Sequence, residues 1–284
     1  MKSKIKLDKS IRDNLPGHFI EIEDGIVHYH ISREGSGEWI VLVHGLVTPM
    51  FVWKPLADDL AAAGFRVLMY DLFGRGYSDR PELKYSPELY IRQLQGMLTG
   101  LNIDKKVNLV GWSMGGAICS LFADRYQDRV NKLAMIAPAL FVEISLMENI
   151  FIYSHLFSWF MHQFGESILL HALKKHFYQP THFPDYFEKV KDQMQYQGFI
   201  ESFISTVRYF PMGAGKRLRT FCKNDLPVLV IWGKEDTITP CMDIGTLSKF
   251  FANCKLFIVD NAGHAPHYEY RAIVNDKLIS FFKN

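Results

Sequence analysis

The chain has 284 residues, 48% of them hydrophobic, which is enough to bury a large core as one domain or as two small ones. Its 32 basic and 30 acidic side chains leave a formal charge of +2, so it has no strong field for nucleic acid and we expect no nucleic-acid partner. Four cysteines without CxxC pairing, and an N-terminus without the apolar core of a secretory signal, favour a reduced, cytoplasmic protein.

Strand and helix patterns alternate along most of the chain. Two short strands come first, at residues 18–23 and 26–31, and the Asp-Gly step between them is typical of a tight antiparallel hairpin. Unbroken apolar runs, the pattern of strands covered on both faces, follow at residues 39–43, 65–70, 107–110, 133–136, 228–232 and 256–259. Helical patterns lie between them, at residues 53–63, 87–101, 117–126, 244–251 and 268–282. The alternation predicts an α/β fold with a mostly parallel eight-stranded sheet and helices on both faces.

One long segment interrupts this rhythm with helical, aromatic-rich sequence and no convincing strand. We therefore predict a core formed by residues 1–138 and 225–284, with residues 139–224 inserted as a helical cap. Its most apolar stretch, residues 150–164, contains two histidines and a glutamine, and is too short and too polar to span a bilayer.

The strand predicted at residues 107–110 leads directly into Gly111-Trp112-Ser113-Met114-Gly115-Gly116 and then into a helix. Gly-x-Ser-x-Gly between a strand and a helix is the pattern of a nucleophile elbow, in which small residues permit a strained turn that exposes the serine hydroxyl. The alternative is that Ser113 is a structural serine capping the helix that follows.

With this motif the chain resembles the α/β-hydrolase family over essentially its whole length. The other matching segments follow successive strands in the family's order, and they are His44-Gly45, Asp71-Leu72-Phe73-Gly74-Arg75-Gly76-Tyr77-Ser78, Gly233-Lys234-Glu235-Asp236 and Gly263-His264. The resemblance implies an α/β-hydrolase fold and acyl transfer through a covalent serine intermediate. Family members that cleave haloalkanes or epoxides carry aspartate at the elbow, so those activities are disfavoured.

A serine hydroxyl needs a base to take its proton and a carboxylate to orient that base. The family's chain order implies His264 as the base, with His267 as the competitor. Asp236 matches the family's acid loop, while Glu235 and Asp260 are the alternatives.

The resemblance also implies an oxyanion hole formed by the backbone N–H groups of Met114 and Leu46. Val47 is the alternative to Leu46, and Trp112 is a candidate for substrate contact. Four other polar residues of the matching segments are expected to shape and brace these loops rather than to react, namely His44, Asp71, Arg75 and Ser78.

The cap contains more aromatic surface than one helix pair needs for its own packing, which favours a lipophilic acyl or aryl substrate. Its aromatic and sulfur side chains include Phe151, Tyr153, Phe157, Trp159, Phe160, Met161, Phe164, Phe177 and Tyr178. A part of the cap flanked by Lys174 and Lys175 is also a candidate for peripheral contact with a membrane surface or lipid.

The main hypothesis is a serine carboxylesterase or lipase acting on a small apolar ester or lipid. One alternative is a carbon–carbon bond hydrolase of aromatic meta-cleavage, whose dicarboxylate-like substrate would need cations such as Arg208, Arg217 and Arg219. Another is a ligand-binding protein on a hydrolase fold without catalysis. No histidine spacing or glycine loop predicts a metal or a phosphate cofactor, so none is expected.

Overall fold

The computed structural model describes residues 4–32, 36–140, 142, 145–210 and 225–284. Eight strands form one sheet in the order β1-β2-β4-β3-β5-β6-β7-β8. β1 pairs antiparallel with β2 and β2 pairs antiparallel with β4, and the other neighbours are parallel. The strands are β1 (His18–Ile22), β2 (Gly25–Ile31), β3 (Trp39–Val43), β4 (Arg66–Tyr70), β5 (Val107–Trp112), β6 (Val130–Ile136), β7 (Val228–Gly233) and β8 (Cys254–Val259). All eight predicted strands are therefore confirmed, as is the mostly parallel sheet.

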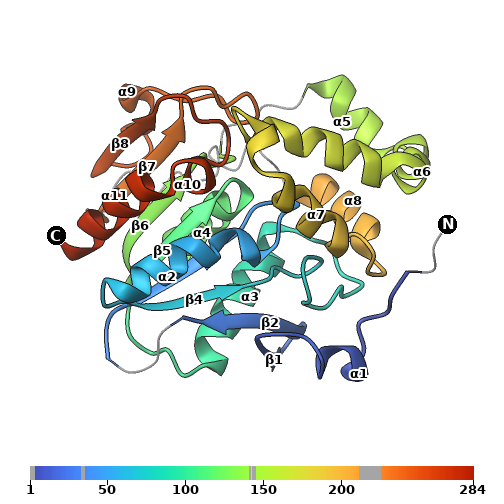
Figure 1. Cartoon of the computed structure of the whole chain (residues 1–284), viewed down its shortest axis with the longest axis horizontal. Coiled ribbons are helices and arrows are strands. Elements are labelled where there is room, and N and C mark those ends of the chain that lie inside the picture. Colours follow the sequence, from blue (N-terminus) through green and yellow to red (C-terminus); the bar gives the residue numbers. More distant parts are fainter. Residues whose placement is uncertain (1–3, 33–35, 141, 143–144, 211–224) are drawn as a thin grey trace.

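Helices cover both faces of the sheet, as Figure 1 shows. α3 and α4 pack on one face, while α2 and α11 pack together on the other. The core helices are α1 (Lys9–Arg12), α2 (Lys54–Ala62), α3 (Pro87–Gly100), α4 (Met114–Arg125), α9 (Ile244–Leu247), α10 (Pro266–Glu269) and α11 (Arg271–Lys283), with 3-10 turns η1 (Met50–Trp53) and η2 (Gln127–Arg129). Strands β3, β5 and β7 are buried along their whole length, which explains their unbroken apolar sequence.

Three predicted helix boundaries were wrong. α4 begins at Met114, three residues earlier than predicted, because the chain turns into the helix directly after Ser113. The final helix is broken at Tyr270, whose φ of −123° and ψ of 51° are not helical. α9 ends at Leu247 rather than continuing to residue 251.

A second group of helices lies at one end of the molecule in Figure 1, and its described part belongs to the segment predicted as the cap. Its elements are α5 (Leu146–Tyr153), α6 (His155–Ala172), η3 (Leu173–His176), η4 (Pro180–His182), α7 (Pro184–Gln193) and α8 (Phe199–Tyr209). The N-terminal arm joins this group, because Ile5 forms a parallel bridge with Tyr196. The division of the chain into core and cap at the predicted residues stays a prediction.

Candidate active site

Ser113 occupies the sharp turn between β5 and α4. Its φ of 55° and ψ of −119° lie in a region that a non-glycine residue adopts only at a cost of about 1–3 kcal/mol. The turn is closed by backbone approach, since a Cβ on Gly111 would collide with the backbone of Gly115, and one on Gly115 with the carbonyl oxygen of Val43. The Ser113 side chain makes no capping hydrogen bond to α4, so the interpretation of this serine as a helix cap was wrong.

The two other predicted triad residues meet at the ends of neighbouring strands. Asp236 follows β7, His264 follows β8, and the distance from His264 Nδ1 to Asp236 Oδ2 is 2.8 Å. Their side chains are almost completely buried. Because a carboxylate oxygen can only accept, Nδ1 carries the proton, which leaves His264 Nε2 free to act as a base.

The local backbone holds the Asp236 carboxylate in its ionised form. Burial alone would raise the pKa of Asp236, but hydrogen bonds from His264 and from the N–H groups of Thr239 and Ile238 lower the pKa below its ordinary value. The two N–H groups donate to Oδ1, and the Thr239 hydroxyl donates at 2.8 Å to Oδ2, the oxygen that also accepts from His264. An ionised acid with this many donors can stabilise a histidine that becomes charged during a reaction.

Trp112 contacts the predicted base, His264, through its backbone and its ring. Its indole is buried and donates to the His264 carbonyl oxygen at 2.7 Å, and the ring lies 5.5 Å from the His264 ring between centroids. The structure thus places Trp112 against the predicted base, while its predicted role in substrate contact stays a prediction.

No hydrogen bond of Ser113 Oγ to His264 occurs among the residues that the structure describes. Hydrogen bonds between catalytic groups often tighten only in the complex with substrate. The serine–histidine link therefore stays a prediction, supported by the position of Ser113 directly after Trp112.

The predicted oxyanion loop after β3 is held by the polar residues that the sequence assigned to structure. Arg75 Nε donates to the Leu46 carbonyl oxygen, and Asp71 Oδ1 accepts from the Met50 N–H at 2.9 Å. His44 donates from Nδ1 to the Gly45 carbonyl oxygen and accepts the Leu72 N–H at Nε2. Burial lowers the pKa of His44 to about 4, so the ring stays neutral, and both of its nitrogens are hydrogen-bonded.

Within the described ranges, neither proposed oxyanion N–H is occupied by a hydrogen bond to another residue. Met114 is the first residue of α4, where backbone N–H groups have no partner inside the helix, and Leu46 lies in the loop that Arg75 anchors. These are the features of a preorganised donor pair. Their role as an oxyanion hole stays a prediction.

The structure gives the competing residues other tasks. Asp260 is exposed and pairs with Lys234 at 2.7 Å, whereas Glu235 accepts the Ala262 N–H. His267 is buried and lies 5.0 Å from the Trp112 ring between centroids. Among the described residues neither of its nitrogens has a hydrogen-bond partner, so it packs rather than faces water.

Most of the cap side chains named in the sequence analysis are exposed, so they do not line an enclosed pocket, and the lipophilic substrate stays a prediction. Phe177 and Met161 are buried, but α5 buries none of its residues and six of the nine predicted side chains are exposed, namely Phe151, Tyr153, Trp159, Phe160, Phe164 and Tyr178. The apolar residues occupy more than one face of α5 and α6, so a single face cannot bury them all.

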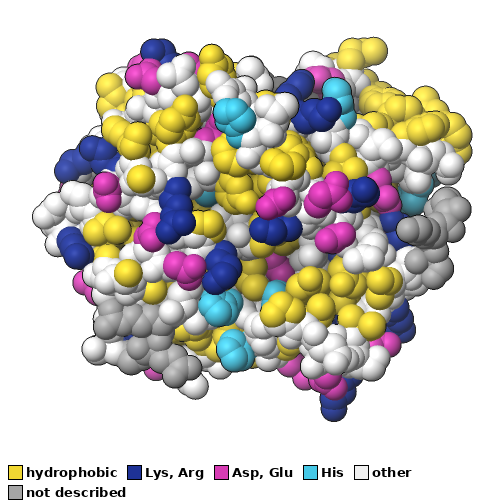
Figure 2. Space-filling model, viewed as in Figure 1, with side chains coloured by type: hydrophobic (Ala, Val, Ile, Leu, Met, Phe, Trp, Pro, Cys, Tyr) yellow, Lys and Arg dark blue, Asp and Glu magenta, His cyan; other side chains and the backbone are white. Residues whose placement is uncertain are grey.

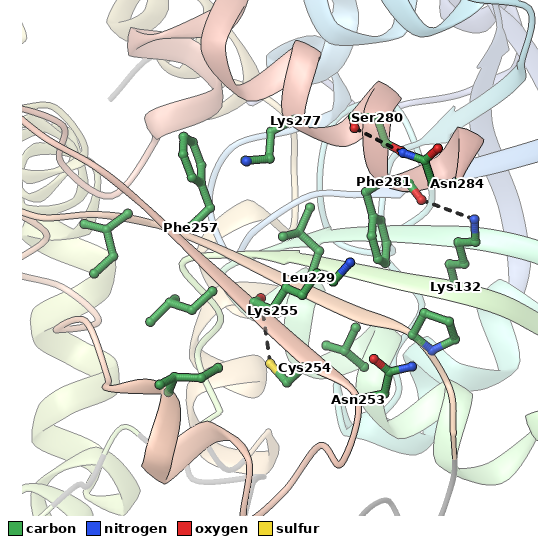
Figure 3. Close-up of a pocket in the computed structure, with 15 residues that line it drawn as sticks. Lys132, Leu229, Asn253, Cys254, Lys255, Phe257, Lys277, Ser280, Phe281 and Asn284 are labelled. Carbon is green, nitrogen blue, oxygen red and sulfur yellow. Dashed lines mark hydrogen bonds between the residues drawn. The ribbon is translucent and has the colours of Figure 1, made fainter.

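Four cavities lined by described residues lie away from Ser113, and two of them adjoin features of interest. One of about 910 Å³ follows the open edge of the sheet along β8, where Lys132, Phe257 and Phe281 surround it (Figure 3). The other, of about 490 Å³, lies beside Asp71 and His28. Neither contains a residue of the predicted triad. Across the described ranges, no group of three or more His, Cys, Asp or Glu side chains could hold a metal ion.

Sequence reasoning missed two residues next to the base. The His176 ring lies 5.3 Å from the His264 ring between centroids, and Glu269 accepts the N–H groups of Gly263 and Tyr178 through its two carboxylate oxygens. Burial raises the pKa of Glu269 to about 7. His176 comes from the segment predicted as the cap and has no motif, so only its tertiary position identifies it.

Comparison with known proteins fits this fold and geometry. A family model described as alpha/beta hydrolase fold matches residues 38–270, and the chain therefore belongs to the α/β hydrolase fold family. The chain is 28% identical to the 2-hydroxy-6-oxononadienedioate/2-hydroxy-6-oxononatrienedioate hydrolase of Burkholderia vietnamiensis, across 92% of this chain and 93% of that protein.

Two further similarities concern a second curated relative and a solved structure. Identity to the 2-hydroxymuconate semialdehyde hydrolase of Pseudomonas sp. strain CF600 is 25%, across 87% of both proteins. The crystal structure of the enol-lactonase from Burkholderia xenovorans LB400 matches with a TM-score of 0.78 at 23% identity, covering 94% of this chain and 100% of that one. At this identity the structural match shows the fold. Together with the family membership, these findings support a hydrolase acting on a small molecule.

Proposed function

We propose that this chain is a serine hydrolase that cleaves a carbon–carbon bond in a meta-cleavage type product, using Ser113, His264 and Asp236. Two curated relatives that align with most of the chain are named as hydrolases of unsaturated hydroxy-oxo acids or semialdehydes. The structural observation that carries the proposal is the 2.8 Å contact between His264 Nδ1 and Asp236 Oδ2, at the same sheet edge as the strained Ser113 turn. This reading replaces the ester hydrolase as the first candidate.

The proposed reaction has two halves. Ser113 Oγ bonds to a substrate carbonyl carbon and passes its proton to His264 Nε2, while the N–H groups of Leu46 and Met114 face the developing oxyanion. The carbon–carbon bond then breaks, and the conjugated carbanion that leaves takes the proton from His264. Water, deprotonated by His264, hydrolyses the acyl group from Ser113.

Cleavage of a carboxylic ester with an apolar acyl or aryl group is the second candidate, and the contacts of Arg208 favour it. Arg208, one of the candidate cations for a dicarboxylate-like substrate, donates to the carbonyl oxygens of Ile152 and Ser154 and to the Ser158 hydroxyl. Arg217 and Arg219 lie outside the described residues. An apolar ester needs no such cations.

A direct comparison of substrates tests the choice. Initial rates would be measured on a dienol-keto acid, followed by loss of its conjugated absorbance, and on p-nitrophenyl esters of increasing acyl length. We expect kcat/KM for the dienol-keto acid to exceed that for every ester, and the reverse order would establish the ester hydrolase instead.

Fluorophosphonate labelling tests the nucleophile separately, because the reagent phosphonylates activated serines. We expect rapid labelling of the wild type and none of Ser113→Ala. If the folded wild type is not labelled and turns over neither substrate class, the ligand-binding alternative replaces both hydrolase proposals.

We further propose that α5 and α6 contact a lipid surface. Figure 2 shows a hydrophobic area at the end of the molecule where Figure 1 places these helices. Leu146, Met147 and Ile150 are 75%, 76% and 60% exposed. Residues 145–165 contain one side chain among Asp, Glu, Lys and Arg, and two exposed lysines, Lys174 and Lys175, follow α6.

Large exposed apolar patches mark interaction surfaces, and aromatic residues beside lysines suit an anionic bilayer interface. No helix within the described ranges has both the length and the apolar character to cross a membrane, which concerns spanning and not surface contact. We expect the full chain to sediment with vesicles containing phosphatidylserine.

The triple variant Leu146→Ser, Met147→Ser, Ile150→Ser should lose most of this binding. Ile273→Ser is the matched control, because Ile273 is 49% exposed on α11. Absence of wild-type sedimentation would refute lipid contact, and a dimer in gel filtration that the triple variant abolishes would assign the surface to a second copy.

A further inference from the structure

A chain of three buried or half-buried polar side chains links the proposed oxyanion loop to the proposed base through the helical segment. The Thr48 hydroxyl lies 2.5 Å from the Tyr186 hydroxyl, and the Tyr186 hydroxyl lies 2.7 Å from His176 Nδ1. Thr48 stands two residues after Leu46 in the loop that follows β3, Tyr186 belongs to α7, and His176 ends η3. Three separate segments therefore meet in one line of hydrogen bonds.

His176 is tied to the His264 loop by its backbone as well as by its ring. Its carbonyl oxygen accepts the Ala265 N–H at 2.9 Å, and its ring lies 5.2 Å from the Trp112 ring between centroids. The backbones of His176 and Gly263 also lie close together, since a Cβ added to Gly263 would meet the His176 carbonyl oxygen at 2.9 Å. His176 thus touches the base on one side and Tyr186 on the other.

The Tyr186 hydroxyl is held in place by its ring. Four aromatic rings surround it, with centroid distances of 4.7 Å to Phe177, 5.3 Å to Tyr268, 5.6 Å to Phe187 and 5.7 Å to Phe51. Both Tyr186 and Thr48 have no solvent exposure. A hydroxyl fixed in this way cannot leave its two partners for water.

Proton counting couples the members of the chain. Burial, with the nearby His264 and His267, keeps the pKa of His176 well below its ordinary value, so the ring is neutral and carries one N–H. Tyr186 has one proton to donate, either to His176 or to Thr48, and the remaining partner must then donate to Tyr186. The orientation of the Thr48 hydroxyl and the tautomer of His176 are consequently set together.

We propose that Tyr186 and His176 are positioning residues, which hold the oxyanion loop and the His264 loop in register through Thr48. The proposal rests on the proposed function, because it assigns a role within the same site. The position of α7 on the core then determines the positions of both the oxyanion donors and His264. A substrate that displaces α7 would therefore also displace these catalytic groups.

The test removes single oxygen atoms without removing the rings. Tyr186→Phe deletes the central hydroxyl, Thr48→Val deletes one end of the chain with little change of shape, and the double variant combines them. Tyr268→Phe is the matched control, because Tyr268 belongs to the same aromatic cluster and no hydrogen bond of its hydroxyl occurs among the described residues. The rate of fluorophosphonate labelling at Ser113 and the kcat and KM for the better substrate are measured for each.

We expect Tyr186→Phe and Thr48→Val each to slow labelling and kcat by about tenfold, with KM changed little, as for the loss of one buried hydrogen bond. The double variant should be no slower than the slower single variant, because both remove the same link. Wild-type rates in Tyr186→Phe, or multiplied effects in the double variant, would overturn the proposal. A folded wild type that is neither labelled nor active on either substrate class would instead refute the proposed function.

Substitution of His176 separates positioning from packing. The amide of Asn reaches the position of Nδ1 and can keep the bond to Tyr186, so His176→Asn should retain most of kcat while His176→Leu loses it. Equal losses in the two variants, with unchanged melting temperature, would show that the bond to Tyr186 has no role in turnover.

Discussion

The sheet core and the helices α5 and α6 are both rich in apolar residues, but the core buries these residues and the two helices leave most of them exposed. Every residue of β3 and β5 is buried, whereas α5 buries none and α6 buries only Met161, Gly165 and Leu169. In the core, apolar sequence is required by packing, and a change there is felt at once. In α5 and α6 the apolar side chains exceed those that the described residues bury, and the proposed lipid contact would account for the surplus.

The largest mutational effect is expected for a core residue, Asp236. Asp236→Asn would place an amide N–H against His264 Nδ1, so the histidine would carry its proton on the nitrogen that must act as the base. We expect kcat to fall by roughly 10³–10⁴-fold, as for other loss of the correct tautomer in a catalytic triad. Steady-state rates on the better substrate measure this.

Asp260→Asn is the control for that loss, because Asp260 is the exposed neighbour that pairs with Lys234. Its rates should match the wild type. If Asp260→Asn and not Asp236→Asn abolishes turnover, the assignment of the acid is wrong.

Adding a methyl group at a glycine is expected to destabilise the core much more than α6. In the core, a Cβ on Gly233 would collide with the backbone carbonyl oxygens of Gly263 and Ala262, which cannot move without shifting the His264 loop. In α6, a Cβ on Gly165 would meet Ile200 Cδ1 at 2.9 Å and Met161 Cε at 3.0 Å, which are the ends of flexible side chains.

We expect Gly233→Ala to lower the free energy of unfolding by about 3 kcal/mol or more. Gly165→Ala should change it by no more than about 1 kcal/mol, because the gain in helix propensity offsets the small displacement. Urea denaturation of both variants gives the two values, and a Gly165→Ala loss as large as that of Gly233→Ala would contradict the contrast drawn between core and cap.

The same contrast decides what the sequence could predict. The first two strands follow from a hairpin pattern and the other six from unbroken apolar runs, while Asp236 and His264 follow from short motifs at strand ends. All of these signals depend on local sequence and a fixed chain order. The Trp112 bond to the His264 carbonyl oxygen joins residues far apart in the chain, and no local pattern indicates it.

The helical segment was harder for a physical reason. Its aromatic residues predict burial, and an amphipathic pattern would have shown which face packs, but apolar residues on several faces of α6 give no direction. Only tertiary contacts identify His176 and Tyr186 as parts of the site, because a lone histidine and a lone tyrosine match no motif.

Acid sensitivity of the core gives a third prediction. Burial lowers the pKa of His267 to about 3, so the folded protein keeps this ring neutral while the unfolded chain takes up a proton below its ordinary value of 6.5. Stability is therefore unaffected above that value and is lost as the pH falls below it. The contribution at pH 5 is about 2 kcal/mol relative to pH 7.5.

His267→Leu removes this proton uptake, and every other titrating group is shared with the wild type. We expect the variant to lose about 2 kcal/mol less stability than the wild type between pH 7.5 and pH 5. Denaturation curves at the two pH values supply the difference, and parallel losses would mean that His267 is protonated in the folded state.

The smallest effect is expected on α5, where it is most informative. Ile150 is 60% exposed and α5 buries no residue, so Ile150→Ser removes little packing and should change the free energy of unfolding by less than about 0.5 kcal/mol. A core residue of the same type, Ile231, is fully buried on β7, and Ile231→Ser should cost about 3 kcal/mol or more because it also buries a hydroxyl. Thermal and urea denaturation of this pair compare one substitution in two environments. A large loss for Ile150→Ser in the monomer would mean that α5 packs more tightly than its exposure indicates, and its apolar face would then need no lipid or second copy to explain it.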